Sequence, residues 1–397
     1  MHRTRRLCDD YPGRLPAWEA STPGSRLVLG AGSQGSGPSV LNTGLIERPP
    51  WGRKRSRIEK FPPTTVTLTL RWEGQNLVLP LVMGQKIHIT EATADERAAA
   101  CRVLYSQLSL AMRTLRTRQV QQQFSRDDDD APLLLIAKYP KDSGVVGAMM
   151  IQPLSATTVV VWPPRTVETG DRFTIETALA TEALVRFRAS GIVHAQALFS
   201  PDELPDGAAL QQVGFQYLTR LQLYQREIVA LDRLTIPPTE LQFIPYSEAD
   251  PTVFAQTLLA TYDGTLDCPE LNNLHSIEDT VAAYLGDRGA SPFCWLVCAK
   301  THAVGVLILT TVPRSTVLEI SYLGLIPAVR GRGLGQALIN FTIRHGSSIG
   351  STAVHLSVDR RNEPARRLYL GKGFGLYDER EVLLWITETA LRKPLKC

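Results

Sequence analysis

A glycine-rich turn at residues 330–335 is the part of the sequence whose residue types and spacing point most directly to chemistry. It reads RGRGLG, follows the apolar run 323–326 and precedes a helical apolar pattern. Glycines leave backbone N–H groups open to a ligand, and the first turn of a helix carries partial positive charge. The turn therefore predicts a site for an anion, above all for phosphate.

Two common phosphate-binding motifs do not fit this turn. A P-loop needs Gly-Lys-Ser/Thr where the helix begins, and that tripeptide is absent here. The dinucleotide fingerprint GxGxxG needs a third glycine after two intervening residues, whereas GRGLG satisfies only GxGxG. The pattern that does fit is Arg/Gln-x-x-Gly-x-Gly/Ala, supplied by Arg330, Gly333 and Gly335.

With this motif, residues 240–390 resemble the GNAT superfamily of acyl-CoA-dependent N-acyltransferases. The resemblance implies an α/β fold with a mixed sheet, and acetyl-CoA as co-substrate without a metal. It also implies that strand amides before the turn hold the pantetheine arm and polarise the thioester carbonyl, while the turn and its arginines hold the pyrophosphate. The residues implied for cofactor binding are Leu323, Gly324, Leu325, Arg330, Gly331, Arg332, Gly333, Leu334, Gly335 and Gln336.

Two further side chains fall on a second stretch of the family pattern, N-x-x-A-x-x-L/F-Y-x-x-x-G-F, which reads NEPARRLYLGKGF from residue 362. The resemblance implies that Asn362 helps to hold the cofactor arm and that Tyr369 protonates the departing thiolate. A phenol with an ordinary pKa of about 10 suits a thiol leaving group. The alternative is that Tyr369 only packs on its helix.

Glu319 lies on the strand predicted before the turn. Strict alternation along that strand places Glu319, Ser321, Leu323 and Leu325 on one face. A carboxylate here resembles the general base of the histone-acetyltransferase branch of the family, which removes a proton from the amine, usually through water. The alternative is a solvated or ion-paired carboxylate.

The resemblance thus implies direct attack of an amine on the acyl carbonyl, with Glu319 as base and Tyr369 as acid. No cysteine nucleophile is required. Cys294 and Cys298 have an even spacing on one predicted strand, and we predict that both are core residues.

The segment 261–279 lies where this family shapes its acceptor site, and it is rich in polar side chains. Such a segment suits recognition of a cationic or hydroxylated amine. The residues predicted for substrate binding are Tyr262, Asp267 and Glu270. A surface loop capped by its own Asp and Asn side chains is an equally good interpretation. Cys268 and His275 lack the two further ligands that a zinc site needs.

Hydrophobic periodicity predicts the elements that must position these residues. In the second half it predicts helices at 250–262, 333–349 and 362–372, and strands at 293–300, 303–312, 317–326, 353–359 and 380–387. In the first half it predicts strands at 64–72, 132–140, 145–154, 157–165, 191–199 and 213–227, and helices at 94–123 and 175–190. The run DDDD at 127–130 is predicted as a solvated loop.

The end of each half shares the order strand, helix, Gly-Phe, strand, which predicts an internal duplication with a period near 160 residues. Matching the two Gly-Phe pairs places Leu210 where Tyr369 stands and Asp171 opposite Arg330. The first copy also lacks the paired glycines, and acids repel phosphate. We therefore predict two tandem GNAT-like domains, the first degenerate and structural, either covering the second or forming one wall of the acceptor cleft.

Composition limits the class of protein. The 397 residues favour two domains plus tails, and the formal charge of +4 comes largely from the first 60 residues, so the charge does not imply a nucleic-acid partner for the folded part and we expect none. Six scattered cysteines without a CxxC pair argue against disulfides and zinc, which favours a cytoplasmic location. No apolar window reaches the length of a membrane span, so we expect no membrane contact.

The predicted organisation is a disordered tail over 1–60, a degenerate GNAT-like domain over 61–230, a linker over 231–240 and a catalytic domain over 241–397. The function predicted from the resemblance is transfer of an acetyl group from acetyl-CoA to a primary amine of a small molecule or a peptide. One alternative is a non-catalytic acyl-CoA-binding or regulatory module. Another, nucleic-acid binding by the basic tail, is weakened by the acids Asp9, Asp10 and Glu19 within it. The pattern leaves the oligomeric state open.

Overall fold

The protein is described by a computed structural model that covers residues 70–72, 75–77, 87–124, 131–140, 144–167, 170–229, 232, 241–272, 274–285, 293–312 and 315–387. The predicted tail, the DDDD run and most of the predicted linker lie outside these residues, as does most of the strand expected at 64–72. Within that strand, β1 (Leu70–Trp72) pairs with β2 (Gln75–Leu77) as a separate antiparallel pair.

One twelve-stranded mixed sheet runs through both halves in the order β3-β4-β5-β6-β7-β14-β8-β13-β12-β11-β10-β9. The first-half strands are β3 (His88–Glu91), β4 (Leu133–Lys138), β5 (Gly147–Pro153), β6 (Thr158–Thr166), β7 (His194–Phe199) and β8 (Gln216–Glu227). Those of the second half are β9 (Gln242–Pro245), β10 (Phe293–Ala299), β11 (His302–Thr311), β12 (Val317–Leu325), β13 (Ala353–Asp359) and β14 (Gly375–Ile386).

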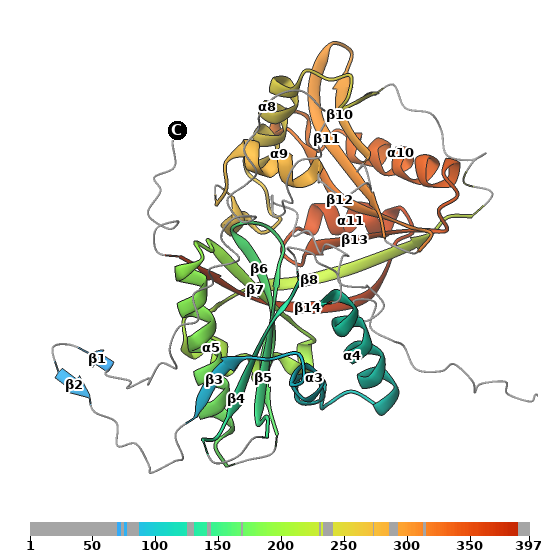
Figure 1. Ribbon diagram of the computed structural model, residues 1–397. Coiled ribbons are helices and arrows are strands. Elements are labelled where there is room, and N and C mark those ends of the chain that lie inside the picture. The colour runs from blue at the N-terminus through green and yellow to red at the C-terminus, as the bar shows by residue number, and fades with distance from the viewer. Residues whose placement is uncertain are drawn as a thin grey trace, which may run out of the picture.

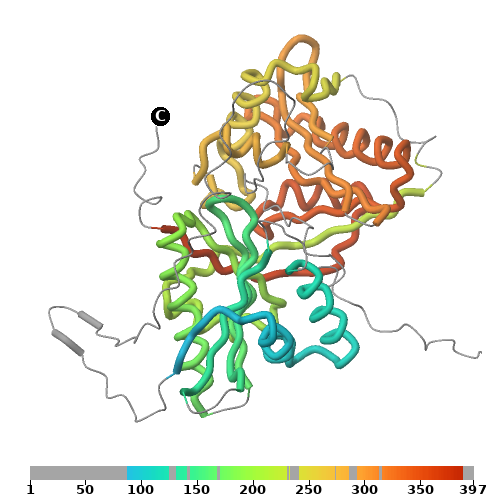
Figure 2. The backbone as a smooth tube through the Cα atoms, in the orientation of Figure 1, coloured from blue at the N-terminus to red at the C-terminus, as the bar shows by residue number. Residues whose placement is uncertain are grey.

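The halves exchange their last strands across the middle of this sheet. Strand β8 of the first half pairs with β13 of the second, and β14 of the second pairs with β7 of the first. Figure 1 shows β8 and β14 running side by side between the two halves, and the tube in Figure 2 follows the same crossing. Each half therefore completes the sheet of the other.

The order is symmetric about the β14–β8 pair, which confirms the tandem arrangement. Among the described strands, the parallel pairs are β6–β7 and β12–β13, which begin at Thr158 opposite His194 and at Val317 opposite Ala353. Both partners of the second pair lie 159 residues beyond those of the first. This agrees with the predicted period, and the α/β fold with a mixed sheet is confirmed.

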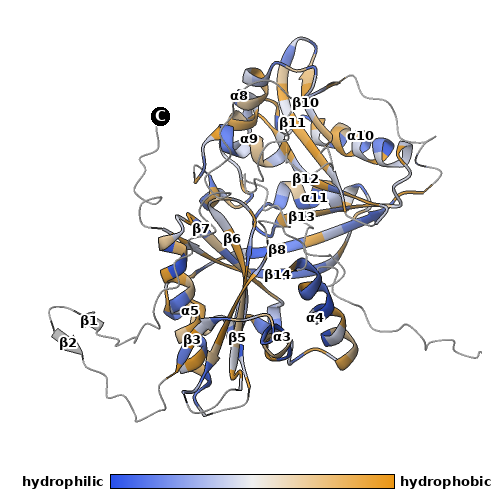
Figure 3. Ribbon diagram, viewed as in Figure 1, coloured by the Kyte–Doolittle hydropathy of each residue, from blue (hydrophilic) through white to orange (hydrophobic). Residues whose placement is uncertain are grey.

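Helices cover both faces of the sheet in each half. In the first half, α5 (Arg172–Ala189) and α6 (Ala208–Gln212) pack on one face, and α3 (Arg97–Leu104) and α4 (Leu110–Phe124) on the other. In the second half, α10 (Leu334–Ser348) and α11 (Glu363–Gly371) face α8 (Pro251–Tyr262) and α9 (Ile277–Leu285) across the sheet. In Figure 3 strands such as β5, β10 and β11 are largely hydrophobic, whereas the central strand β8 and the helix α4 are mostly hydrophilic.

Local signals explain where the helices of the second half begin. Asp250 caps α8, because its carboxylate accepts the N–H groups of Thr252 at 2.7 Å and Val253 at 3.2 Å. The side chain of Asn362 caps α11 by accepting the N–H of Ala365. A proline in the first turn, where no N–H is needed, supports both starts.

Three expectations of the coarse pattern were wrong. The single helix at 94–123 is broken between Leu104 and Leu110, where the guanidinium of Arg113 donates to three carbonyls of the break. The last strand begins at Gly375 rather than at 380, because its first residues already pair with β8. The segment 261–279 ends in the first turn of a helix, since α9 begins at Ile277.

Strict alternation along β12 was also wrong. A bulge between Ile320 and Tyr322 inserts Ser321, whose backbone has no pairing partner on β11. Leu323 and Leu325 consequently pack with Ile320 on the α10 face, instead of sharing a face with Glu319. Cys294 and Cys298 are buried in the cluster below α8 and α9, as predicted.

Candidate active site

A cleft opens where the parallel strands β12 and β13 part. Their pairing ends at Ile320 opposite Leu356, although β12 continues to Leu325 and β13 to Asp359. The end of α8, the loop after it and α11 close the remaining sides, and Tyr369 lies in the wall. Backbone groups of β12 beyond Ile320 thus face an opening instead of a neighbouring strand.

Gly324 leaves β12 without a side chain at the point where the strand packs against the end of α8. A Cβ atom there would lie 2.6 Å from the hydroxyl of Tyr322 and 2.8 Å from Cβ of Thr261. These two neighbours hydrogen-bond to each other through their hydroxyl groups. The strand is therefore locked against α8 at this point, and only glycine fits.

The glycine turn leads from β12 into α10 at the edge of the cleft. Gly331 and Gly333 have φ values of 73° and 81°, in the region that favours glycine, and a Cβ on either would meet nothing within 4 Å. Gly333 is the N-cap of α10, and no side chain caps this end of the helix. The N–H groups of Leu334 and Gly335 at the start of α10 are therefore open to a ligand, whereas that of Gln336 donates to the carbonyl oxygen of Gly333 at 3.1 Å.

Gly335 has a different role within the same turn. A Cβ there would lie 2.9 Å from Cδ2 of Leu368, so the missing side chain lets α10 pack against α11. Because Leu368 and Tyr369 are neighbours on α11, this contact also fixes the tyrosine relative to the turn.

Arg330 lines the cleft, yet its side chain is engaged with the protein itself. The guanidinium donates to the carbonyl oxygens of Leu325 at 2.9 Å, Thr261 at 2.9 Å and Gly264 at 3.2 Å. These bonds tie the end of β12 to the end of α8. The contribution of Arg330 to cofactor binding stays a prediction. The hydrogen bonds of its guanidinium show that Arg330 also has a structural role.

Tyr369 is buried in the cleft wall, with 7% of its surface exposed. Its ring packs near Phe374 and Tyr224, at centroid distances of 5.8 Å and 6.5 Å. Burial raises its pKa well above the ordinary value, and the nearby carboxylate of Asp267 raises it further. The phenol therefore holds its proton at neutral pH. Asn362 lies beside it in the lining, with its side-chain oxygen occupied in capping α11.

Glu319 lies next to the cleft on the α8 side of the sheet. It pairs with Thr310 of β11 and His355 of β13, one residue before Ile320, which does line the cleft. Burial raises its pKa to about 7. A carboxylate with that pKa accepts and releases protons near neutral pH, which suits a general base.

The three residues predicted to bind the acceptor lie in different surroundings. Asp267 lines the cleft, and burial raises its pKa to about 6. Glu270 instead forms a two-pronged ion pair with Arg361, with distances of 2.6 Å and 2.9 Å. Tyr262 packs in the core between α8 and the sheet, where its ring lies edge-on to Tyr322.

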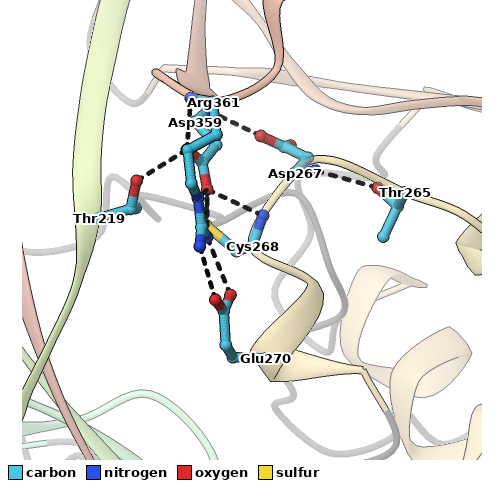
Figure 4. Close-up of polar contacts among 7 residues, drawn as sticks. All are labelled: Thr219, Thr265, Asp267, Cys268, Glu270, Asp359 and Arg361. Carbon is cyan, nitrogen blue, oxygen red and sulfur yellow. Dashed lines mark hydrogen bonds and ion pairs between the residues drawn. The ribbon is translucent and has the colours of Figure 1, made fainter.

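Asp359 and Arg361 are central to this region and were missed by the sequence reasoning. Asp359 is fully buried and accepts hydrogen bonds from Thr219, Cys268 and Arg361, as Figure 4 shows. Burial alone would raise its pKa, but the bonds from Arg361 and Thr219 outweigh that effect and hold the pKa low. The only signal in the sequence was an acid directly after a buried strand.

The described residues contain no helix long and apolar enough to cross a membrane. Within the same part of the chain, no three His, Cys, Asp or Glu side chains are grouped as metal ligands.

Comparison with known proteins finds a family model that matches the region around this site. The model of the acetyltransferase (GNAT) family matches residues 258–375, from α8 to the start of β14. A mycothiol acetyltransferase of Nocardiopsis dassonvillei is 40% identical over 92 residues, which are 23% of this chain and 26% of that protein. One of Frankia alni is 41% identical over 59 residues, which are 15% of this chain and 18% of that protein. The chain thus spans about a quarter or less of these two curated relatives.

Solved structures with a similar arrangement are also known. The chain is similar to a GCN5-related N-acetyltransferase from Sphaerobacter thermophilus, with a TM-score of 0.45 and 15% identity over 76% of this chain and 95% of the other. It is also similar to a tandem GNAT protein from the clavulanic acid biosynthesis pathway, with a TM-score of 0.41 and 15% identity over 76% of this chain and 98% of the other. The match to the acetyltransferase (GNAT) family model extends over the cleft, the glycine turn, Glu319 and Tyr369.

Proposed function

We propose that the protein transfers an acetyl group from acetyl-CoA to a primary amine of a small molecule or a peptide. The observation that carries the proposal is the cleft between β12 and β13, which leads to the glycine turn at the start of α10 and has Tyr369 in its wall. A long, thin ligand with a phosphate group partway along it matches this shape and charge.

Several features of the cleft fit acetyl-CoA. The backbone of β12 beyond Ile320, which faces the opening, leaves room for the pantetheine arm, and its N–H groups would act as donors to the carbonyl groups of that arm. The open turn at Gly331 and Gly333, together with the N-terminus of α10, would hold the pyrophosphate. Once bound, acetyl-CoA supplies the reactive thioester.

The residues around the cleft supply the remaining chemistry. N–H groups of β12 between Leu323 and Leu325 would polarise the carbonyl under attack, as donors in an oxyanion hole do. Glu319 would accept the proton of the amine through water, because its pKa of about 7 leaves it partly ionised at neutral pH. Tyr369 would give its proton to the departing sulfur.

The acceptor side favours a cationic amine. The carboxylate of Asp267 faces the cleft near Tyr369, and an ammonium group beside it would be attracted before it loses its proton. The curated relatives are named mycothiol acetyltransferases, so their acceptor belongs in any panel of amines tested.

Calorimetry with acetyl-CoA, followed by a coupled assay of free thiol release, tests the proposal. The panel would contain glucosamine, a tripeptide with a free α-amino group and the acceptor of the mycothiol acetyltransferases. Binding together with amine-dependent thiol release is the expected result. Binding without release for any amine would favour a non-catalytic acyl-CoA module, and absence of binding would overturn the proposal.

A further inference from the structure

The loop between α8 and α9 rests on strands that include one from the first half. This acceptor loop comprises residues 265–272 and 274–276. Its apolar side chains Cys268, Leu271 and Leu274 are buried against Leu218, Leu221 and Leu223 of β8, with Val382 and Leu384 of β14 in the same cluster. The floor beneath the loop is thus built from the two exchanged strands, and β8 belongs to the first half.

A polar contact from the same first-half strand reinforces this packing. The hydroxyl of Thr219 on β8 donates to the buried carboxylate of Asp359 at 2.7 Å. That carboxylate also accepts the N–H of Cys268 in the loop at 3.2 Å. In return, the N–H of Asp359 donates to the carboxylate of Asp267 at 2.7 Å. Asp267 and Cys268 are therefore clamped onto the end of β13 by a reciprocal pair of hydrogen bonds.

The far end of the loop also touches the first half. The ring of His275 lies within 3.3 Å of the ring of His194 on β7, and within 3.5 Å of the hydroxyls of Thr157 and Thr158 at the start of β6. His194 is buried, so this contact lies inside the protein. First-half residues consequently hold the loop at both ends, while Arg361 and Glu270 fasten its middle from the second half.

The loop matters for the proposed reaction because it carries Asp267. Asp267 lines the cleft near Tyr369, and its position depends on the bond from Asp359. Cys268, the next residue, has φ of 46°, which is unfavourable for a side chain other than glycine and persists only where surrounding contacts impose it. Loss of those contacts would let the loop relax and withdraw Asp267 from the cleft.

We propose that the first half acts in the transfer reaction as the platform of the acceptor loop, and that Thr219 is a positioning residue for amine recognition which never touches acyl-CoA. This inference rests on the proposed function. It assigns the first half a task that needs no cofactor of its own. It also predicts that a substitution in the first half changes use of the amine and leaves use of acetyl-CoA alone.

The test compares Thr219→Val with Thr219→Ser in the full chain. Valine keeps the shape of threonine and removes the hydroxyl, whereas serine keeps the hydroxyl. Asp359 retains its bonds from Cys268 and Arg361 in both variants, so both are expected to fold, and thermal unfolding checks this. Three quantities are compared: hydrogen exchange over residues 265–272 without ligand, the Kd for acetyl-CoA, and KM for glucosamine or the tripeptide.

For Thr219→Val we expect about tenfold faster exchange in the loop and a KM for the amine raised by about three- to tenfold, the size of effect that loss of one ordinary hydrogen bond produces. The Kd for acetyl-CoA should stay within about twofold of the wild type, and Thr219→Ser should behave as the wild type does. The platform proposal would be overturned by unchanged hydrogen exchange in the loop or by an unchanged KM for the amine. It would also be overturned if acetyl-CoA binding weakened as much as the amine KM rose. A wild-type protein inactive with every amine would overturn the proposed function, while the exchange comparison would still decide the platform.

Discussion

The second half leaves an opening where its parallel strands part, whereas the first half bridges the corresponding place with charged side chains. Strands β6 and β7 pair from Thr158 to Val161, over the same four positions as β12 and β13. Beyond them β6 carries Pro163 and Pro164, which have no N–H group to offer a ligand, and then Arg165. Equal backbone topology therefore does not imply an equal cleft.

Arg165 is buried and forms ion pairs with Asp206 and Glu203, which lie in the short helical segment after β7. Arg172 also pairs with Asp206 and adds Glu176 to the cluster. Burial by itself would raise the pKa of Asp206, but the two arginines outweigh it and hold the pKa low. In the first half these side chains form ion pairs with one another, at the place that corresponds to the proposed pantetheine site of the second half.

A few differences in side chain thus distinguish the proposed acyl-CoA cleft of the second half from the ion-paired region at the corresponding place in the first half. Arg165 and Arg172 of the first half stand at the sequence positions that match Gly324 and Gly331 of the second half. Leu210, at the position that matches Tyr369, is buried in the first-half core. This comparison supports the prediction that the first half binds no acyl-CoA. Substitutions that act on one half and spare the other test it.

The largest effect is expected from the double variant Gly333→Val, Gly335→Val. Valine at 333 is strained at a φ of 81°, and valine at 335 collides with Leu368, so the turn can no longer present its N–H groups. Acetyl-CoA binding measured by calorimetry should weaken by at least about a hundredfold, or about 2.7 kcal/mol.

Gly191→Ala is the matched control in the first half. Gly191 has φ of 72° and open space around its missing Cβ, so the substitution introduces similar backbone strain away from the cleft. It should lower stability by about 1–2 kcal/mol and leave acetyl-CoA affinity unchanged. Equal losses of binding in both variants would mean that the turn acts only through stability.

Tyr369→Phe should lower kcat by about a hundredfold or more, because it removes the proposed acid without changing the shape of the cleft. The Kd for acetyl-CoA should stay close to that of the wild type. Stopped-flow or steady-state thiol release measures the first quantity and calorimetry the second. A variant with full kcat would assign the tyrosine to packing alone.

The counterpart Leu210→Ala sharpens this result. Leu210 is fully buried in the first-half core, so truncation should cost about 2–5 kcal/mol of unfolding free energy. The folded fraction should nevertheless turn over at the wild-type rate, since Leu210 lies outside the second cleft.

Glu319 should impose a pH dependence that the first half has no means to produce. Its raised pKa of about 7 predicts that kcat falls about tenfold for each pH unit below 7, because only the ionised carboxylate accepts a proton. Glu319→Gln should remove this limb of the profile. The matching position on β6 is Val160, opposite Gln196, and neither group titrates.

Stability gives an independent check on the same carboxyl group. Its folded-state pKa is raised above the ordinary 4.5, so ionisation costs stability as pH rises from 4.5 towards 7. Glu319→Gln removes that cost and should gain stability relative to the wild type at pH 8 more than at pH 4. Urea denaturation at the two pH values measures the difference, and a difference of the opposite sign would contradict a raised pKa.

Much of the fold was predictable because its patterns are local. The strands from β4 to β8 and from β10 to β13, and the long helices, carry clear periodicity, and the duplication is visible in the repeated Gly-Phe segment. The exchange of β8 and β14 was not predictable, because both strands show the same alternation and nothing local selects their partners. The break after Leu104 was missed because it depends on Arg113 reaching back to carbonyls of the preceding turn.

The site was predictable where it is a contiguous motif and hidden where it joins distant segments. The glycine turn was predicted from its residue types and spacing, and Tyr369 from its resemblance to the family pattern; both roles stay predictions. The bond between Thr219 and Asp359 joins residues 140 apart, and the bonds of Arg330 to α8 depend on how the loop folds back. Glu270 was predicted to bind the acceptor. Its ion pair with Arg361 could not be predicted, because the two residues lie 91 positions apart in the sequence.

Arg165→Met should have the smallest effect on the proposed reaction, because it should leave acetyl-CoA binding unchanged, and it tests the first half most directly. Loss of its charged hydrogen bonds should lower the unfolding free energy by about 1.5–3 kcal/mol, since Asp206 keeps Arg172 as a partner. Arg367→Met, which removes an exposed ion pair on α11, is the control and should leave stability nearly unchanged. Calorimetry should find one acetyl-CoA per chain in the wild type and in both variants. Two sites in the wild type and one in Arg165→Met would instead mean that the cluster binds phosphate, and the two halves would then differ in degree rather than in kind.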